Sequence, residues 1–85
     1  MTTLYILNNP DLFQQCSAVL DENDGLLLIE NAVVLAQQLE PKTAGFVLEE
    51  DLVARGLDSN GSWGNKDYDG FVALTLEYDK TVSWL

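Results

Sequence analysis

The sequence contains no histidine, a single cysteine and few positive charges. Its 85 residues include four Lys or Arg against fourteen Asp or Glu, which gives a formal net charge of -10. Without histidine the chain cannot host a Ser-His-Asp or Cys-His catalytic pair, and a zinc site would need carboxylates and one thiol. We therefore expect no bound metal and no cofactor.

The four positive charges are scattered along the chain, at Lys42, Arg55, Lys66 and Lys80. Nucleic-acid binding depends on the neutralisation of phosphates by Lys and Arg, so direct binding of RNA or DNA is not expected. The acidic field would also repel anionic membrane surfaces. Partners of this chain should therefore be basic or apolar.

A single cysteine cannot form an intramolecular disulfide, which favours a reducing compartment. The first residues lack the basic segment and the long apolar run of a signal peptide. The longest apolar stretch, 26–36, is interrupted by Glu30 and Asn31 and is shorter than the roughly 18 residues that span a bilayer. The sequence therefore predicts a cytoplasmic protein with no membrane contact.

The composition is that of a folded protein, with 47% hydrophobic and 21% charged residues. A chain this short buries only about 60% of the surface that its unfolded form exposes, so neighbouring subunits would add stability. We expect one domain over residues 1–85 that works in an oligomer.

Short apolar runs alternate with helical patterns along the chain. Strands are expected at 4–7, 26–29, 44–48 and 81–85, and helices after Pro10, over 31–39, over 49–55 and from 67 to about 78. The segment 58–67 is rich in turn residues, so a fourth strand there should be short or absent. The alternation predicts an α/β fold: a single three-layer domain with a small, mostly parallel open sheet flanked by helices.

Several residues are suited to the ends of these helices. Asn31 and Asp67 have the short polar side chains that cap helix N-termini. Three acids, 49–51, lie at the positive end of a helix dipole, and Gly56 can adopt the left-handed conformation that ends the same helix.

Three segments carry a resemblance to a known family. The first, 26–33, is a leucine-rich strand followed by an acid, with Asn31-Ala32 where the relatives have Asp-Gly. The second, 47–57, matches the block Tyr-Ala-Leu-x-x-Asp-x-x-Ala-Arg-Gly-Leu almost position for position. The third, 68–75, followed by Ser83-Trp84-Leu85, matches a Tyr-x-x-Phe-Val-x-Leu helix and a Trp-containing C-terminus. In this order they resemble the DsrE/DsrF/DsrH-like sulfur-relay family, specifically its DsrH/TusB branch.

The resemblance implies a non-catalytic or accessory subunit of a cytoplasmic sulfur-relay (sulfurtransferase) complex. Its partners would be TusC/DsrF-like and TusD/DsrE-like sister subunits, and the persulfide would end in 2-thiouridine at the tRNA wobble position. The main catalytic cysteine would belong to a sister subunit. A DsrH-type role in sulfur oxidation and a homo-oligomeric binding module of the same fold remain alternatives.

Cys16 is the one nucleophile to weigh as a persulfide site. A persulfide carrier needs an accessible thiol with a lowered pKa. Cys16 instead lies on the apolar face of the first predicted helix, with Leu12, Phe13, Val19 and Leu20. We therefore expect a buried thiol and no catalytic residue, and keep a persulfide-carrying sulfurtransferase that uses Cys16 as an alternative.

Four residues are candidates for a partner interface: Trp84, Phe71, Glu49 and Glu50. Tryptophan is enriched in interface hot spots, and the two acids could steer a basic partner. Trp63 is expected to fill the core. The acidic segment 21–24 lacks the ligand spacing of a calcium loop and is interpreted as a solvated turn.

Overall fold

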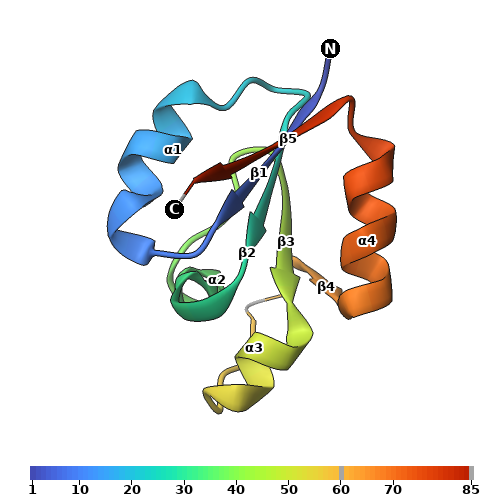
Figure 1. Cartoon of the computed structure of the whole chain (residues 1–85). Coiled ribbons are helices and arrows are strands. Elements are labelled where there is room, and N and C mark those ends of the chain that lie inside the picture. Colours follow the sequence, from blue (N-terminus) through green and yellow to red (C-terminus); the bar gives the residue numbers. More distant parts are fainter. Residues whose placement is uncertain (60, 85) are drawn as a thin grey trace.

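The computed structural model describes residues 1–59 and 61–84, which form one five-stranded parallel sheet flanked by helices (Figure 1). The strands are β1 (Thr3–Leu7), β2 (Gly25–Leu28), β3 (Ala44–Leu48), β4 (Gly64–Lys66) and β5 (Lys80–Trp84). The 3-10 helices are η1 (Pro10–Leu12) and η2 (Glu30–Val34), and the α-helices are α1 (Phe13–Val19), α2 (Leu35–Gln38), α3 (Glu49–Ala54) and α4 (Tyr68–Glu77). The predicted α/β class is confirmed, and every pair of neighbouring strands among the described residues is parallel.

The strand order β4-β3-β2-β1-β5 explains the three layers. The chain steps in one direction from β1 to β4 and then returns past β1 to form β5. Since crossovers between parallel strands are right-handed, reversing the direction of the step moves the connecting helix to the other face of the sheet. Accordingly α4 lies on the opposite side of the sheet from α1 (Figure 1).

The two faces of the sheet bury two separate hydrophobic clusters. The first cluster lies under α1 and α2 and includes Leu7, Cys16, Leu28 and Val47. The second lies under α4 and comprises Leu4, Ile6, Leu27 and Leu74, with partly buried side chains around them. All four residues of β2 are buried, because this strand is covered on both faces.

The helix expected over 31–39 differs from the prediction at its start. It begins at Glu30 as a 3-10 turn and becomes α-helical only at Leu35. The prediction of Asn31 as its N-cap is wrong: the cap position is Ile29, and the Asn31 side chain instead accepts hydrogen bonds from Arg55.

Four other expectations have clear outcomes. Asp67 caps α4 by accepting a 2.7 Å hydrogen bond from the Gly70 N–H, as predicted. The fourth strand is short, as predicted. Val19 does not join the buried face of α1 and is 43% exposed, because the helix ends there and Leu20 packs against the core instead. The predicted C-terminal strand begins one residue early, at Lys80, and Leu85 lies outside the described residues.

Two glycines allow aromatic side chains to lie directly on the sheet. A Cβ atom at Gly45 would come within 2.7 Å of the Trp63 ring and 2.5 Å of the Pro41 Cβ. A Cβ atom at Gly25 would overlap the hydroxyl of Tyr78, at the end of α4. These close approaches need glycine, because any larger side chain would push the ring off the strand.

Asp24 corrects the interpretation of segment 21–24 as a solvated turn. Its neighbours 21–23 are exposed, but the Asp24 side chain is 5% exposed. One carboxylate oxygen accepts a 3.0 Å hydrogen bond from the Thr3 N–H at the start of β1, and the other accepts a 2.9 Å bond from the Asp21 N–H. The residue thus ties the loop before β2 to β1.

Replacement of Asp24 by alanine is expected to lower the free energy of unfolding by about 2 kcal/mol. The variant removes two charge-assisted hydrogen bonds and leaves the buried Thr3 N–H without this acceptor. Urea unfolding followed by circular dichroism measures the difference. Asp21→Ala, which removes an exposed side chain, should change it by less than about 0.5 kcal/mol; equal losses for both variants would contradict the assignment.

None of the helices in the part of the chain that the structure describes is long and apolar enough to cross a membrane.

Candidate functional site

Cys16 lies in the middle of α1 and points into the first hydrophobic cluster. Its side chain is 0% exposed, and its neighbours in that cluster include Leu7, Leu28 and Ala32. Burial raises the pKa of the Cys16 thiol to about 11, because the thiolate would lose its hydration in this apolar setting. The thiol is therefore neutral near pH 7, and its expected burial is confirmed.

Two of the motif segments meet at the carboxyl end of the sheet. The Arg55 guanidinium donates to the Asn31 side-chain oxygen, with Nη2 at 3.0 Å and Nε at 3.3 Å. The Asp51 carboxylate accepts a 2.6 Å hydrogen bond from the Glu30 N–H. Glu30 has a φ of 51°, in the left-handed region, and this bond helps to hold the strained turn after β2.

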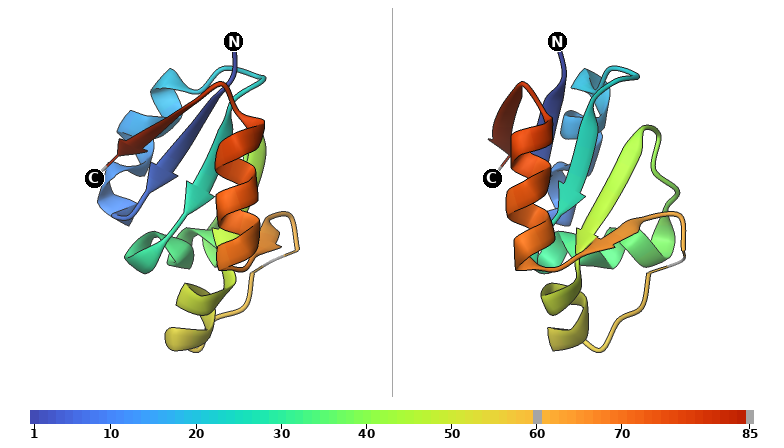
Figure 2. Two further views of the ribbon diagram at one scale, coloured as in Figure 1. Left: turned by 45° about the vertical axis from the view of Figure 1, so that its right-hand side comes forward. Right: turned by 90° about the vertical axis from the view of Figure 1, so that its right-hand side faces the viewer.

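The end of α3 explains the Arg-Gly-Leu sequence at the end of motif segment 47–57. Gly56 adopts a φ of 65°, as predicted. Its N–H donates to the Val53 carbonyl, and the Leu57 N–H donates to the Leu52 carbonyl. This pair of bonds is a Schellman motif, which satisfies carbonyls that the helix end leaves unpaired. These motif residues join α3, which projects beyond the strands in Figure 2, to the turn after β2.

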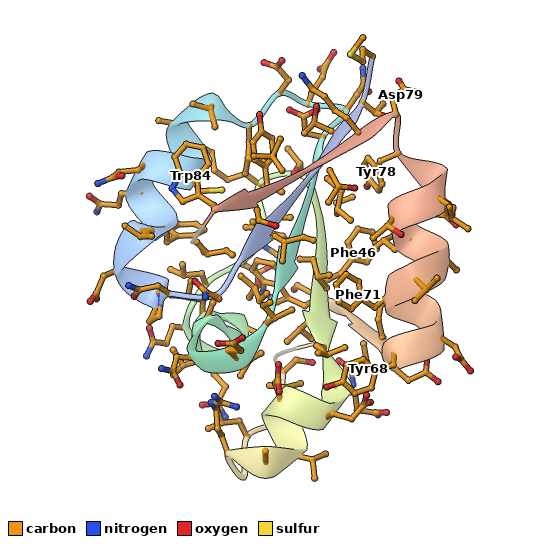
Figure 3. All side chains as sticks on the ribbon, in the orientation of Figure 1. Phe46, Tyr68, Phe71, Tyr78, Asp79 and Trp84 are labelled. Atoms are coloured by element: carbon orange, nitrogen blue, oxygen red, sulfur yellow. The ribbon has the colours of Figure 1, made fainter. Side chains whose placement is uncertain are left out.

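The four candidate interface residues do not form one surface. Trp84, on β5, is half-buried and packs edge-to-face on Tyr5, with ring centroids 6.1 Å apart. Phe71, on α4, is half-buried and packs on the second cluster, on the other side of the sheet (Figure 3). Glu49 is exposed and Glu50 half-buried in the first turn of α3. That these four residues contact a partner stays a prediction.

Helix α4 carries an apolar surface that the sequence reasoning missed. Tyr68, Val72 and Leu76 are 58%, 60% and 81% exposed, while Leu74 of the same helix is 2% exposed. Their i, i+4, i+8 spacing places the three side chains in a row about 12 Å long. We call this row the α4 stripe. Its signal in the sequence is the spacing itself, in a helix whose remaining positions also include apolar residues.

The described residues form no pocket, and none of them form a cluster of His, Cys, Asp or Glu able to hold a metal ion.

The fold and the exposed surfaces together define a small doubly wound α/β protein with a buried thiol and an apolar outer face on α4. The family model for DsrH-like proteins matches residues 8–81, so the chain belongs to the DsrH-like family, which connects it with sulfur relay. A comparison with curated proteins found no match.

Proposed function

We propose that the chain is a non-catalytic, accessory subunit of a cytoplasmic sulfur-relay complex. It assembles with TusC/DsrF-like and TusD/DsrE-like sister subunits and supports persulfide transfer toward 2-thiolation of the tRNA wobble uridine. The sister subunits carry the persulfide and contact the tRNA. The DsrH-like family match supports the sulfur-relay context.

The observation that carries the accessory role is the burial of Cys16. A sulfur carrier must present a thiolate to its donor and acceptor, so it needs an accessible thiol with a pKa near or below neutrality. Cys16 is 0% exposed, and its pKa is raised to about 11. Both properties are opposite to those of a carrier, and they favour the accessory role over a persulfide-carrying sulfurtransferase.

The net charge of the chain also favours an accessory role, with tRNA bound by a sister subunit. A net charge of -10 opposes the approach of a polyanion such as tRNA, because binding requires phosphate neutralisation by Lys and Arg. Another subunit must therefore hold the RNA.

Co-expression with the two sister subunits, followed by native mass spectrometry, tests the proposal. We expect a complex that contains all three chains and supports thiolation of tRNA in a reconstituted relay, with Cys16→Ala retaining assembly and most of the activity. A chain that stays monomeric in the presence of both sister subunits would refute the proposal. A complex whose thiolation activity is abolished by Cys16→Ala, with assembly intact, would refute the accessory role alone.

A further inference from the structure

Helix α4 is apolar on two sides. Its inner side packs Phe71 and Leu74 on the second cluster, and Tyr78, just after the helix, covers Gly25. Its outer side carries the α4 stripe, Tyr68, Val72 and Leu76, each more than half exposed. A helix on the surface of a monomer normally presents polar residues outward, and one that is apolar all round is normally buried. The α4 stripe is therefore an exposed apolar surface of the kind that marks a contact with a partner.

The charges beside the stripe indicate what covers it. Asp69 and Glu77, next in sequence to Tyr68 and Leu76, are both exposed, with the small exposed Ala73 between them. This row runs along one side of the α4 stripe, because Asp69 and Val72, and likewise Ala73 and Leu76, are three residues apart and therefore neighbours on the helix surface. The stripe thus has an acidic border on this side, broken by a small residue over which a partner backbone can approach closely.

More carboxylates follow at the lower end of α4. Leu48 of β3 pairs in register with Lys66 of β4, so Glu49 and Asp67, which follow them, both lie at the carboxyl end of adjacent strands. Figure 3 shows Tyr68 at this end of α4, close to the start of α3. The nearby Lys66 ammonium lies 5.5 Å from the centre of the Phe46 ring, on the sheet side of the helix. Acidic residues therefore flank the stripe along one side and at its lower end.

A second copy of the chain is a poor cover for this surface. Pairing two stripes would bring two acidic borders together, and the two chains would carry net charges of -10 each. Like charges placed opposite each other at an interface are unfavourable. A partner with basic residues around an apolar centre has the complementary charge pattern.

We propose that the α4 stripe is a docking surface for a protein partner that presents an apolar helix face bordered by Lys or Arg. The inference rests on the proposed function, in which that partner is one of the sister subunits. Three side chains cannot supply the roughly 800 Å² per partner of a stable interface. The stripe is accordingly the apolar centre of the contact, and the surrounding acids form its polar rim.

Calorimetric titration of the purified chain with each sister subunit tests the docking surface. Leu76→Asp and Val72→Asp, at outward positions of α4, are each expected to weaken binding about tenfold or more. Val19→Asp is the matched control: it replaces an exposed apolar residue on α1, across the sheet, and should leave the affinity unchanged. Thermal unfolding by circular dichroism identifies any variant that is not folded.

The contribution of the acidic residues beside the stripe is tested by measuring the rate of association. The double variant Asp69→Lys/Glu77→Lys should slow association about tenfold at low salt, and raising the salt concentration should reduce the difference. Folded Leu76→Asp and Val72→Asp variants that bind like the wild type would overturn the docking surface while leaving the proposed function intact. A homodimer that Leu76→Asp dissociates would overturn the choice of partner. A wild-type chain that binds neither sister subunit would instead refute the proposed function, and this inference with it.

Discussion

At pH 7.5 the native protein is expected to react with iodoacetamide at least about a hundredfold more slowly than the protein unfolded in urea. Thiol alkylation proceeds through the thiolate, and raising the pKa of Cys16 from 9.0 to about 11 lowers the thiolate fraction near neutral pH by about two orders of magnitude. Burial of the sulfur in the first cluster slows the reaction further. Mass spectrometry of samples quenched over time measures both rates.

The pH dependence of the same reaction gives a second test. The alkylation rate of the native protein should keep rising until the pH approaches 11, whereas the rate of the unfolded protein levels off near pH 9.

The raised pKa of Cys16 also makes stability depend on pH. Between about pH 9 and pH 11 the folded state retains the thiol proton, whereas the unfolded state releases it. The stability contributed by this group is therefore complete below about pH 9 and is lost as the pH rises through 11.

The control for alkylation is Cys16→Ser, which removes the reaction entirely. Native Cys16 that reacts within tenfold of the unfolded rate would contradict the accessory role. A mass increase of about 32 Da after incubation with a sulfur donor, which indicates a persulfide, would favour the persulfide-carrying alternative instead.

Replacement of Trp63 by alanine is expected to lower the free energy of unfolding by about 3–5 kcal/mol. Trp63 is 3% exposed and lies on Gly45 of β3. Its indole Nε1–H donates a 2.8 Å hydrogen bond to the Leu39 carbonyl, just after α2. The side chain therefore fills the first cluster and also joins the loop before β4 to the end of α2.

Urea unfolding followed by circular dichroism measures this loss, and the midpoint of thermal unfolding should fall by more than about 12 °C. Trp63→Phe, which retains most of the ring contacts, should lose less than half as much. Trp84→Ala is the matched control, because Trp84 is only half-buried at the sheet edge. A loss below about 1 kcal/mol for Trp63→Ala would contradict the assigned role.

Much of the fold follows from local patterns. The apolar run 26–29 predicts a strand covered on both faces, and β2 is such a strand. Gly56 and Asp67 were expected at helix ends because left-handed backbone and side-chain capping are local requirements, and both residues occupy those positions. The apolar spacing around Cys16 likewise predicts its burial, since only one side of α1 faces the sheet.

Features that depend on distant segments could not be predicted in this way. Asp24 is buried because its carboxylate reaches the Thr3 N–H, on a strand 21 residues earlier. Asn31 does not cap its helix because the 3-10 turn already begins at Glu30, and its side chain accepts hydrogen bonds from Arg55 instead. Both outcomes require knowledge of which loops meet in space.

The α4 stripe was missed for a different reason. Periodicity identifies the buried side of a helix when polar residues occupy the other side. In α4 apolar residues occur on both sides, so the sequence does not say which of them meet the sheet. The topology decides this, by seating Leu74 on β1 and β2 and leaving Leu76 outward.

The pairing of β5 with β1 makes completion of the sheet a long-range event. Thr2 and Asp79, which are 77 residues apart in sequence, are joined by hydrogen bonds at the start of this pair. Until residues 80–84 are available, β1 is an edge strand with unpaired backbone groups, which is a hazard for aggregation. Closing such a large loop also slows folding. During synthesis, one edge of β1 therefore stays unpaired until residues 80–84 have been made. A chain truncated before Lys80 would keep that edge of β1 unpaired permanently.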